Sequence, residues 1–237
     1  MSENEIKILA LLPAYNEAAH LGKVLEEVKK QTADILVIDD GSKDNTAEIA
    51  RESGVELLSR GYNCGKGQSL KDGFTWALER GYDAVIMLDS DGQHDPACIK
   101  DFIAKYHETR APLIIGARDY GEIPLRRRIP NMIGKVLFSA AVGRNIPDNQ
   151  SGYRMLNRML MDRMLKSKES GYHFEVEMIA ICIAEDWPIE WIRIPTIYGD
   201  ETSSQDPFDQ IFGFPKMCLK ARRIIREKRQ EKCSPQK

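Results

Sequence analysis

The segment AVIMLDSDGQ, at residues 84–93, decides the fold of this chain. Its first half is an uninterrupted apolar run and its second half is acidic and small, a pattern typical of a buried strand that ends at a ligand-binding edge. Further apolar runs of strand length lie at residues 6–12, 35–38, 55–58 and 113–117. Helical patterns separate these runs, such as the leucines and valines spaced i, i+3, i+4 and i+7 from Leu21 to Val28. Strands that alternate with helices of this length predict βαβ units, right-handed crossovers and a mostly parallel sheet.

The second half of the sequence is less regular. It predicts helices near residues 130–142 and 174–184, a strand near residues 189–197, and a helix at the C-terminus. No repeat, low-complexity segment or linker divides the chain. We therefore expect one α/β domain over residues 1–210, followed by a basic amphipathic tail over residues 211–237 that is not a separate domain.

The composition is that of an ordinary globular protein. Of the 237 residues, 42% are hydrophobic and 30% are charged, which excludes a disordered chain. No apolar run reaches the ~18 residues that a membrane span needs, and the acidic start of the chain does not resemble a signal peptide, so we expect a cytoplasmic protein. The cysteines are odd in number and lack paired spacing, which argues against a disulfide framework and a zinc site; they are Cys64, Cys98, Cys182, Cys218 and Cys233.

The small net charge of −2 hides an uneven distribution. Residues 211–237 contain nine Lys/Arg and two Glu, which leaves the other 210 residues with 25 basic and 34 acidic side chains. An acidic body is not typical of a nucleic-acid-binding domain, whereas a basic tail suggests contact with an anionic surface. The tail also carries Phe212, Phe214, Met217, Leu219, Ile224 and Ile225. It is compatible with a peripheral contact to the cytoplasmic face of a membrane, and equally with a helix that packs on the body.

Polar residues collect where the predicted strands end. Residues 13–17 follow the first strand, residues 39–42 follow the second, residues 89–93 follow the fourth, and Arg118 follows the fifth. Because parallel strands place their carboxyl ends at one edge of a sheet, where ligands bind in open α/β folds, we expect these clusters to converge.

Two of these segments, and the glycine-rich segment at residues 63–67, indicate particular chemistry. Asp89 and Asp91, with the amide oxygen of Gln93, form an all-oxygen ligand set suited to Mg²⁺ or Mn²⁺; the alternative is a turn whose acids cap the next helix. Asp40 is suited to accept hydrogen bonds from a nucleobase or ribose, although its residue neighbours also favour a simple turn. Lys66 opens a helix from a glycine-rich segment that favours phosphate, but the spacing fits neither a P-loop nor GxGxxG.

The motifs, taken in order, resemble those of family 2 glycosyltransferases with the GT-A fold. They are Pro13-Ala14-Tyr15-Asn16-Glu17, Asp39-Asp40-Gly41-Ser42-Lys43-Asp44, Asn63-Cys64-Gly65-Lys66-Gly67 and Asp89-Ser90-Asp91-Gly92-Gln93-His94. Three more look like the dolichyl-phosphate mannosyltransferase branch: Gly116-Ala117-Arg118, Ser151-Gly152-Tyr153-Arg154 and Gly171-Tyr172-His173-Phe174-Glu175. The resemblance covers residues 6 to about 200 and implies a GT-A catalytic domain, with a Rossmann-like sheet flanked by helices and a less regular acceptor-side half.

The resemblance implies a donor site, a metal site and an acceptor site. A nucleoside-diphosphate sugar, GDP- or UDP-linked, would contact Pro13, Ala14, Tyr15, Glu17, Asp40, Lys66, Asp89 and Asp91. Mg²⁺ or Mn²⁺ would be held by Asp89, Asp91 and Gln93. A polyprenyl phosphate acceptor would contact Arg118, Asn131, Arg154 and one of Arg126, Arg127 and Arg128, of which we choose Arg127. Asp91, Arg118 and Arg127 would be the catalytic residues.

The implied reaction is an inverting transfer of a hexose to the lipid phosphate. An anionic phosphate needs positioning by arginines more than it needs a base. The alternatives are a family 2 enzyme that glycosylates a saccharide hydroxyl with Asp148 as the base, and a nucleotide-sugar-binding protein without turnover. One departure from the branch lies at residues 198–206, which carry no basic residue where the branch has an arginine and a Ser-Lys pair. We therefore expect a closing loop that works differently, or another donor or acceptor.

Overall fold

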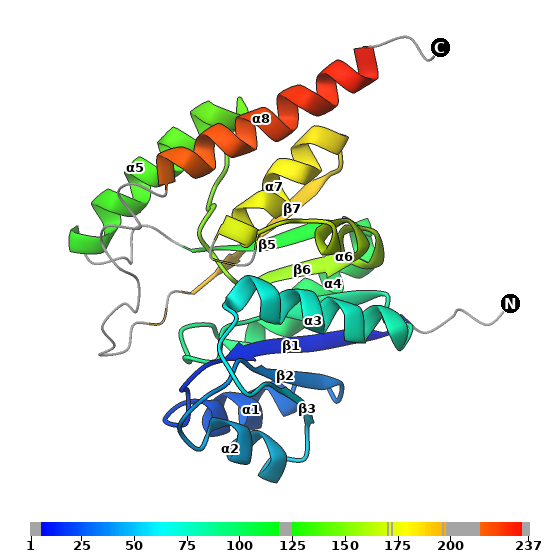
Figure 1. The fold of residues 1–237 in the computed structure, drawn as a ribbon, viewed down its shortest axis with the longest axis vertical. Helices are drawn as coiled ribbons and strands as arrows, with labels where there is room; N and C mark the ends of the chain where they lie inside the picture. The colour runs from blue at the N-terminus through cyan, green and yellow to red at the C-terminus, as the bar shows by residue number, and fades with distance from the viewer. Residues whose placement is uncertain are drawn as a thin grey trace, which may run out of the picture.

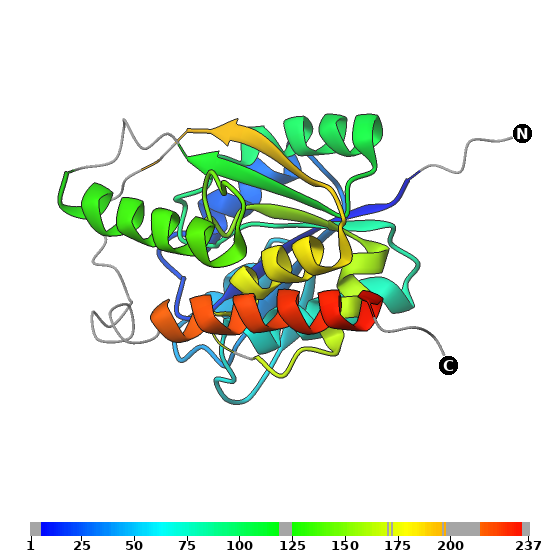
Figure 2. The same ribbon diagram turned by 90° about the horizontal axis from the view of Figure 1, so that it is seen from above.

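The computed structural model describes residues 6–118, 125–169, 171, 173–195, 197 and 214–233. These residues form a seven-stranded sheet with helices on both faces (Figures 1 and 2). The strands lie in the order β3-β2-β1-β4-β6-β5-β7. Their bounds are β1 Ile8–Ala14, β2 Ile35–Asp39, β3 Glu56–Ser59, β4 Ala84–Met87, β5 Leu113–Arg118, β6 Arg154–Asn157 and β7 Ile189–Ile194. The expectation of a mostly parallel α/β sheet is confirmed.

One strand of the sheet runs against the others. β6 pairs antiparallel with both β4 and β5, whereas β1, β2, β3 and β4 pair in parallel and β7 pairs in parallel with β5. The sequence predicts every strand except β6, which is only four residues long and begins with an arginine. Since β6 is antiparallel, the chain enters it from the same edge at which the parallel strands end.

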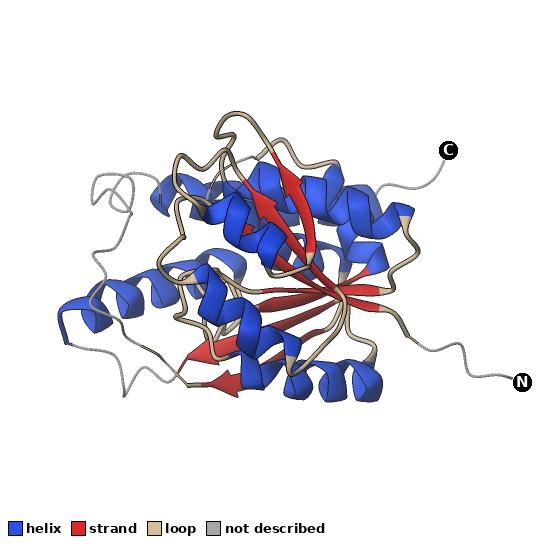
Figure 3. Ribbon diagram, turned by 90° about the horizontal axis from the view of Figure 1, so that it is seen from below, coloured by secondary structure: helices blue, strands red, loops and turns tan. Residues whose placement is uncertain are grey.

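The helices pack on the sheet in two layers (Figure 3). Their bounds are α1 Leu21–Lys29, α2 Thr46–Glu52, α3 Lys66–Glu79, α4 Ile99–Thr109, α5 Leu125–Val142, α6 Arg158–Leu165, α7 His173–Glu185 and α8 Phe214–Cys233. Alternate residues of β1 point to opposite faces. Leu9 and Leu11 join the core under α3, α6 and α7, whereas Ala10 and Leu12 join the core under α1 and α4.

The close packing of α3 on β1 fixes the position of the helix start. A Cβ atom added at Gly73 would lie 2.5 Å from Leu11 Cδ1, so only glycine allows this approach without displacing the strand side chain. α3 begins at Lys66, at the carboxyl edge of the sheet, and its register against β1 therefore sets where the Lys66 side chain lies. Among the described residues, no helix has both the length and the apolar character needed to cross a membrane.

Candidate active site

The loops that follow β1, β2 and β4 meet at the carboxyl edge of the sheet. The backbone N–H of Asn16 donates to Ser42 Oγ at 2.9 Å, and the backbone N–H of Lys43 donates to Asn16 Oδ1 at 2.8 Å. Ser90 Oγ donates to the carbonyl of Pro13 at 2.8 Å. The clusters that sequence places at separate strand ends thus form one continuous polar edge.

The residues predicted to line the nucleotide pocket lie along this edge. Pro13 and Ala14 end β1, and Ala14 is buried. Tyr15 is 42% exposed beside them. The Glu17 carboxylate lies 3.3 Å from His20 Nδ1, and its own backbone N–H donates to Thr46 Oγ1 at 2.8 Å. Contact between these residues and a nucleotide stays a prediction.

An ammonium group lies between two carboxylates at the end of β4. Lys66 Nζ is 2.5 Å from Asp89 Oδ1 and 3.0 Å from Glu175 Oε1, and Glu175 comes from the first turn of α7. Gly152 approaches the same cluster so closely that an added Cβ would lie 2.7 Å from Asp89 Oδ2. Three segments far apart in sequence therefore converge on this cluster, and a larger residue at position 152 would displace the Asp89 carboxylate.

The charges of this cluster reinforce one another. Burial alone would lower the pKa of Lys66, but the nearby Asp89 and Glu175 outweigh it and raise that pKa, so the ammonium stays charged. Burial likewise opposes ionisation of Asp89, but Lys66 outweighs it and the pKa of Asp89 lies below its usual value. Glu175 lies in one of the motifs of the resemblance, but the sequence predicts no role for it. It reaches Lys66 because α7 packs beside α3.

Asp91 completes the acidic pair predicted to hold a metal ion. Its Oδ1 accepts a hydrogen bond from the backbone N–H of Gln93 at 2.9 Å. Burial, followed by the charge of Asp89, raises the pKa of Asp91. In the described part of the chain, no three His, Cys, Asp or Glu side chains form a metal site by themselves. The donor set therefore suits an ion such as Mg²⁺ or Mn²⁺, which commonly takes one or two carboxylates and completes its shell with substrate phosphates and water.

His94 holds the backbone of the acidic segment in place. Its Nδ1 accepts a hydrogen bond from the backbone N–H of Asp89 at 3.0 Å, and its ring stacks on Tyr153 with a centroid distance of 5.0 Å. Burial lowers the pKa of His94, which keeps the imidazole neutral and Nδ1 able to accept. His94 is thus a positioning residue for Asp89, a role that the motif alone did not reveal.

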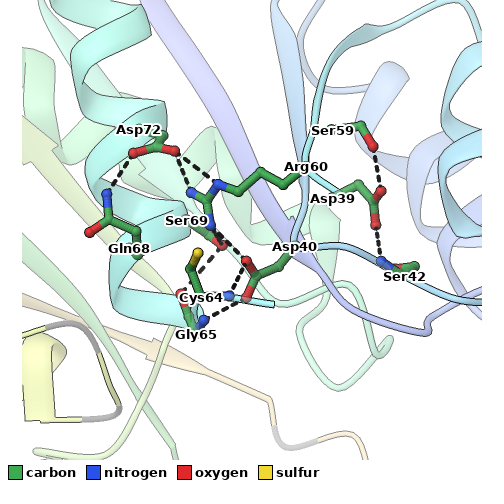
Figure 4. A network of polar contacts seen from close by, with 10 residues as sticks. All are labelled: Asp39, Asp40, Ser42, Ser59, Arg60, Cys64, Gly65, Gln68, Ser69 and Asp72. Carbon is green, nitrogen blue, oxygen red and sulfur yellow. Dashed lines mark hydrogen bonds and ion pairs between the residues drawn. The ribbon is translucent and has the colours of Figure 1, made fainter. Parts of the chain in front are cut away.

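Asp40 is buried, and its carboxylate accepts hydrogen bonds from neighbouring side-chain and backbone groups (Figure 4). Its Oδ1 accepts hydrogen bonds from Arg60 at 2.6 Å and from the backbone N–H of Cys64 at 2.9 Å, and its Oδ2 accepts from the backbone N–H of Gly65 at 2.8 Å. These bonds use three of the roughly four acceptor positions of a carboxylate. Asp40 therefore shapes the loop that leads into α3, and at most one acceptor position remains for the predicted contact with a nucleotide.

Arg60 joins this loop to α3. Its guanidinium binds Asp40 and also Asp72, whose other oxygen accepts from Gln68 Nε2 at 2.8 Å (Figure 4). The neighbouring Asp39 is held separately, by the backbone N–H of Ser42 at 3.0 Å. The acidic pair after β2 thus organises the loops on either side of it.

Replacing Arg60 with methionine should lower the free energy of unfolding by about 2 kcal/mol, because two carboxylates lose their shared cation and the better buried one, Asp40, keeps only its two backbone hydrogen bonds. The expected secondary effect is weaker donor binding, since the loop before Lys66 loses its anchor. Urea denaturation of Arg60→Met should be compared with Arg51→Met on the exposed face of α2. Equal stability of the two variants would contradict this role.

Arg118 and Asp148 form a bidentate pair at the end of β5. Arg118 Nε lies 2.8 Å from Asp148 Oδ2 and Arg118 Nη2 lies 3.1 Å from Oδ1. Asp148 is fully buried and also accepts backbone hydrogen bonds from Gln150 and Ser151. Burial opposes its ionisation, but Arg118 outweighs burial and holds the pKa of Asp148 below its usual value. A buried carboxylate with a lowered pKa is poorly suited to act as a general base, which weighs against the saccharide-hydroxyl alternative.

Arg154 does not lie where the acceptor-phosphate prediction needs it. It is the first residue of β6, and its side chain has no exposed surface. Its guanidinium donates to the carbonyls of Ser151 at 2.7 Å and Asn149 at 3.2 Å, and to the carbonyl of Glu175. We correct the predicted role accordingly, since Arg154 ties the loop before β6 to α7 and has no surface to offer a phosphate.

The remaining acceptor-side predictions fall partly outside the described structure. Arg126, Arg127, Arg128 and Asn131 lie on α5, whose backbone is described, but their side chains are outside the described residues. The segment at residues 198–206, expected to close over the donor, also lies outside the described residues. The roles of these residues stay predictions.

Comparison with known proteins places this geometry in a family. Residues 10–165 match the family model described as glycosyl transferase family 2. The chain is 34% identical over 230 residues to an uncharacterised protein of Methanocaldococcus jannaschii, covering 90% of this chain and 98% of that one. It is 31% identical over 187 residues to an undecaprenyl-phosphate mannosyltransferase of Micrococcus luteus, covering 73% of this chain and 76% of that protein.

Solved structures show the same fold. One is the glucosyl-3-phosphoglycerate synthase of Mycobacterium tuberculosis in complex with Mn²⁺, uridine-diphosphate-glucose and phosphoglyceric acid. It superposes with a TM-score of 0.76 at 18% identity, covering 92% of this chain and 80% of that one. At this identity the likeness establishes the GT-A fold alone.

Proposed function

This chain belongs to glycosyl transferase family 2, and we propose that it transfers a hexose from a nucleoside-diphosphate sugar to a polyprenyl phosphate, with Mg²⁺ or Mn²⁺ as cofactor. The observation that carries the proposal is the arrangement at the carboxyl edge. There β4 ends beside the Asp89–Lys66 pair and β5 ends at the paired Arg118, and the single strand β6 separates the two. A relative of known name acts on undecaprenyl phosphate, which supports this class of acceptor.

On the donor side, we assign Asp89, Asp91 and Gln93 to the ion and Lys66 to the diphosphate. A bound divalent ion would supply Lewis-acid stabilisation of the charge that develops on the leaving nucleoside diphosphate. Lys66 adds a positive charge at the start of α3, where the backbone N–H groups also favour an anion. The same ammonium binds Asp89 and Glu175, which positions it beside the acidic pair.

On the acceptor side, the state of Asp148 favours a phosphate over a hydroxyl. A saccharide hydroxyl must lose a proton during attack, and the carboxylate nearest to Arg118 is buried and paired. A phosphate oxygen attacks as an anion and needs only orientation by cations such as Arg118. Attack from the face opposite the leaving group would invert the anomeric carbon.

A panel of donors and acceptors tests this function. GDP-mannose, UDP-glucose and UDP-N-acetylglucosamine should each be offered with a short, water-soluble polyprenyl phosphate and, in parallel, with a free saccharide. We expect transfer from one donor to the lipid phosphate, dependent on Mg²⁺ or Mn²⁺ and abolished by a chelator. Transfer to the saccharide alone would favour the alternative acceptor. Donor binding without any transfer would indicate a nucleotide-sugar-binding protein.

A further inference from the structure

Glu175 is a buried acidic residue beside the predicted donor and metal sites. Its side chain is 4% exposed, and Oε1 lies 3.0 Å from Lys66 Nζ, which also binds Asp89. Acidic side chains are almost never fully buried unless they are paired, so the lysine accounts for the burial of Glu175. It does not account for an arrangement in which one ammonium serves two carboxylates, of which one, Asp89, is proposed to hold the divalent ion.

Contacts with β6 and the segment before it fix the position of Glu175. The guanidinium of Arg154 donates to the Glu175 carbonyl and, through Nε, to the carbonyl of Ser151 at 2.7 Å. A Cβ atom added at Gly152 would lie 3.2 Å from Glu175 Oε1 and 3.1 Å from Lys66 Nζ. These contacts involve backbone atoms and packing rather than the charge of Glu175, so a glutamine of the same shape can occupy this position.

Lys66 and a divalent ion would compete for the Asp89 carboxylate. The ammonium lies 2.5 Å from Asp89 Oδ1, and two cations on one carboxylate repel each other at such short range. If Asp89 were its only acidic partner, binding of the ion would leave the partly buried ammonium without a counter-charge, which is costly. Glu175 supplies that counter-charge, so the ion can bind Asp89 while the ammonium stays beside the site.

We propose that Glu175 is a positioning residue, which holds Lys66 so that the ammonium and the divalent ion occupy the site together. The proposal rests on the proposed function, because it takes Asp89 as a ligand of the ion and Lys66 as a partner of the donor diphosphate. Glu175 contributes through its charge on Lys66 and not by contact with a reacting atom. Residues that hold the groups around a metal ion from outside commonly change its affinity about 10–100-fold.

Titration with Mn²⁺ in the absence of nucleotide tests the proposal without any transfer reaction. Electron paramagnetic resonance of the free ion gives the dissociation constant. Glu175→Gln should weaken Mn²⁺ binding on the order of tenfold, because Lys66 is then neutralised by Asp89 and competes more strongly for it. Glu177→Gln is the matched control and should bind Mn²⁺ as the wild type does. Glu177 lies on the same helix, and its partner, Lys220 of α8, is likewise shared by two carboxylates.

A double variant separates an effect through Lys66 from a general effect on the fold. Lys66→Met/Glu175→Gln removes both charges of the pair, and it should bind Mn²⁺ about tenfold more tightly than Glu175→Gln because the competing ammonium is gone. Thermal melts show that each variant is folded. A double variant that binds Mn²⁺ as weakly as Glu175→Gln would overturn the proposal, and so would equal affinities of Glu175→Gln and wild type. Affinities in the expected order without transfer from any donor would support this proposal and count against the proposed function alone.

Discussion

Replacing Asp89 with asparagine is expected to lower kcat/KM for glycosyl transfer by on the order of 10²–10³-fold, the size of effect seen when one preorganised electrostatic group is removed from an active site. The substitution removes one of the two charges proposed to hold the divalent ion. It also leaves Lys66, now 2.5 Å from that carboxylate, with Glu175 as its remaining acidic partner. The measurement is the initial rate at saturating Mn²⁺, accompanied by a thermal melt to show that the variant is folded.

The control for Asp89 is Asp95, a nearby carboxylate that caps a helical turn. Asp95 Oδ1 accepts a hydrogen bond from the backbone N–H of Ala97 at 2.9 Å and begins the short helical turn before α4. Asp95→Asn should therefore cost about 1 kcal/mol of stability at most, with little change in rate. Similar rate losses in the two variants would show that the effect is a general one on this loop and would remove the special role of Asp89.

Replacing Asp148 with asparagine is expected to destabilise the protein by about 3 kcal/mol, because a buried partner of Arg118 loses its charge and Arg118 keeps its own. A general base would behave differently: its loss would stop turnover and leave the stability nearly unchanged. Chemical denaturation and the transfer rate, measured on the same preparation, distinguish the two roles. Unchanged stability with abolished transfer would revive the saccharide-hydroxyl mechanism.

The pH dependence of stability gives an independent test of Asp148. Its pKa is lowered in the folded state, so its stabilising contribution is complete above the unfolded value near 4 and is lost as pH falls through the folded value. The difference in unfolding free energy between wild type and Asp148→Asn should therefore be constant from about pH 5 to pH 8 and shrink below about pH 4. A difference that stays constant down to pH 2 would contradict the proposed ion pair.

Much of this fold follows from periodicity, and the exceptions have physical causes. The parallel strands are continuous apolar runs because both of their faces are covered, and such runs are visible in the sequence. β6 was missed because it is short and starts with Arg154, a residue type that is seldom fully buried. The burial of Arg154 depends on hydrogen bonds to the backbone carbonyl groups of Asn149, Ser151 and Glu175. No local sequence pattern predicts such partners.

For the candidate site, too, one part could be predicted from the sequence and another part could not. Convergence of the strand-end clusters could be predicted, because parallel strands share an edge. The partners of those residues could not, since Asp40 meets Arg60 twenty positions away and Lys66 meets Glu175 across more than a hundred. Arg118 is predicted to contact the acceptor phosphate, but the sequence did not indicate that its guanidinium also binds Asp148. Such pairings depend on loop conformations and strand order, which periodicity does not encode.

The antiparallel strand β6 also determines the spacing between the proposed donor and acceptor sites. β4 and β5 are separated by β6, so Asp89 and Arg118 stand on strands roughly 10 Å apart, and the six residues 148–153 that enter β6 lie between them. At one end of this hexapeptide Asp148 grips Arg118, and towards the other Gly152 rests against Asp89. In the proposed reaction, this hexapeptide would set the distance between the leaving nucleoside diphosphate and the attacking phosphate. Inserting one residue into this hexapeptide would increase the separation of the two sites without changing a residue of either. We would then expect hydrolysis of the donor sugar to exceed its transfer to the acceptor.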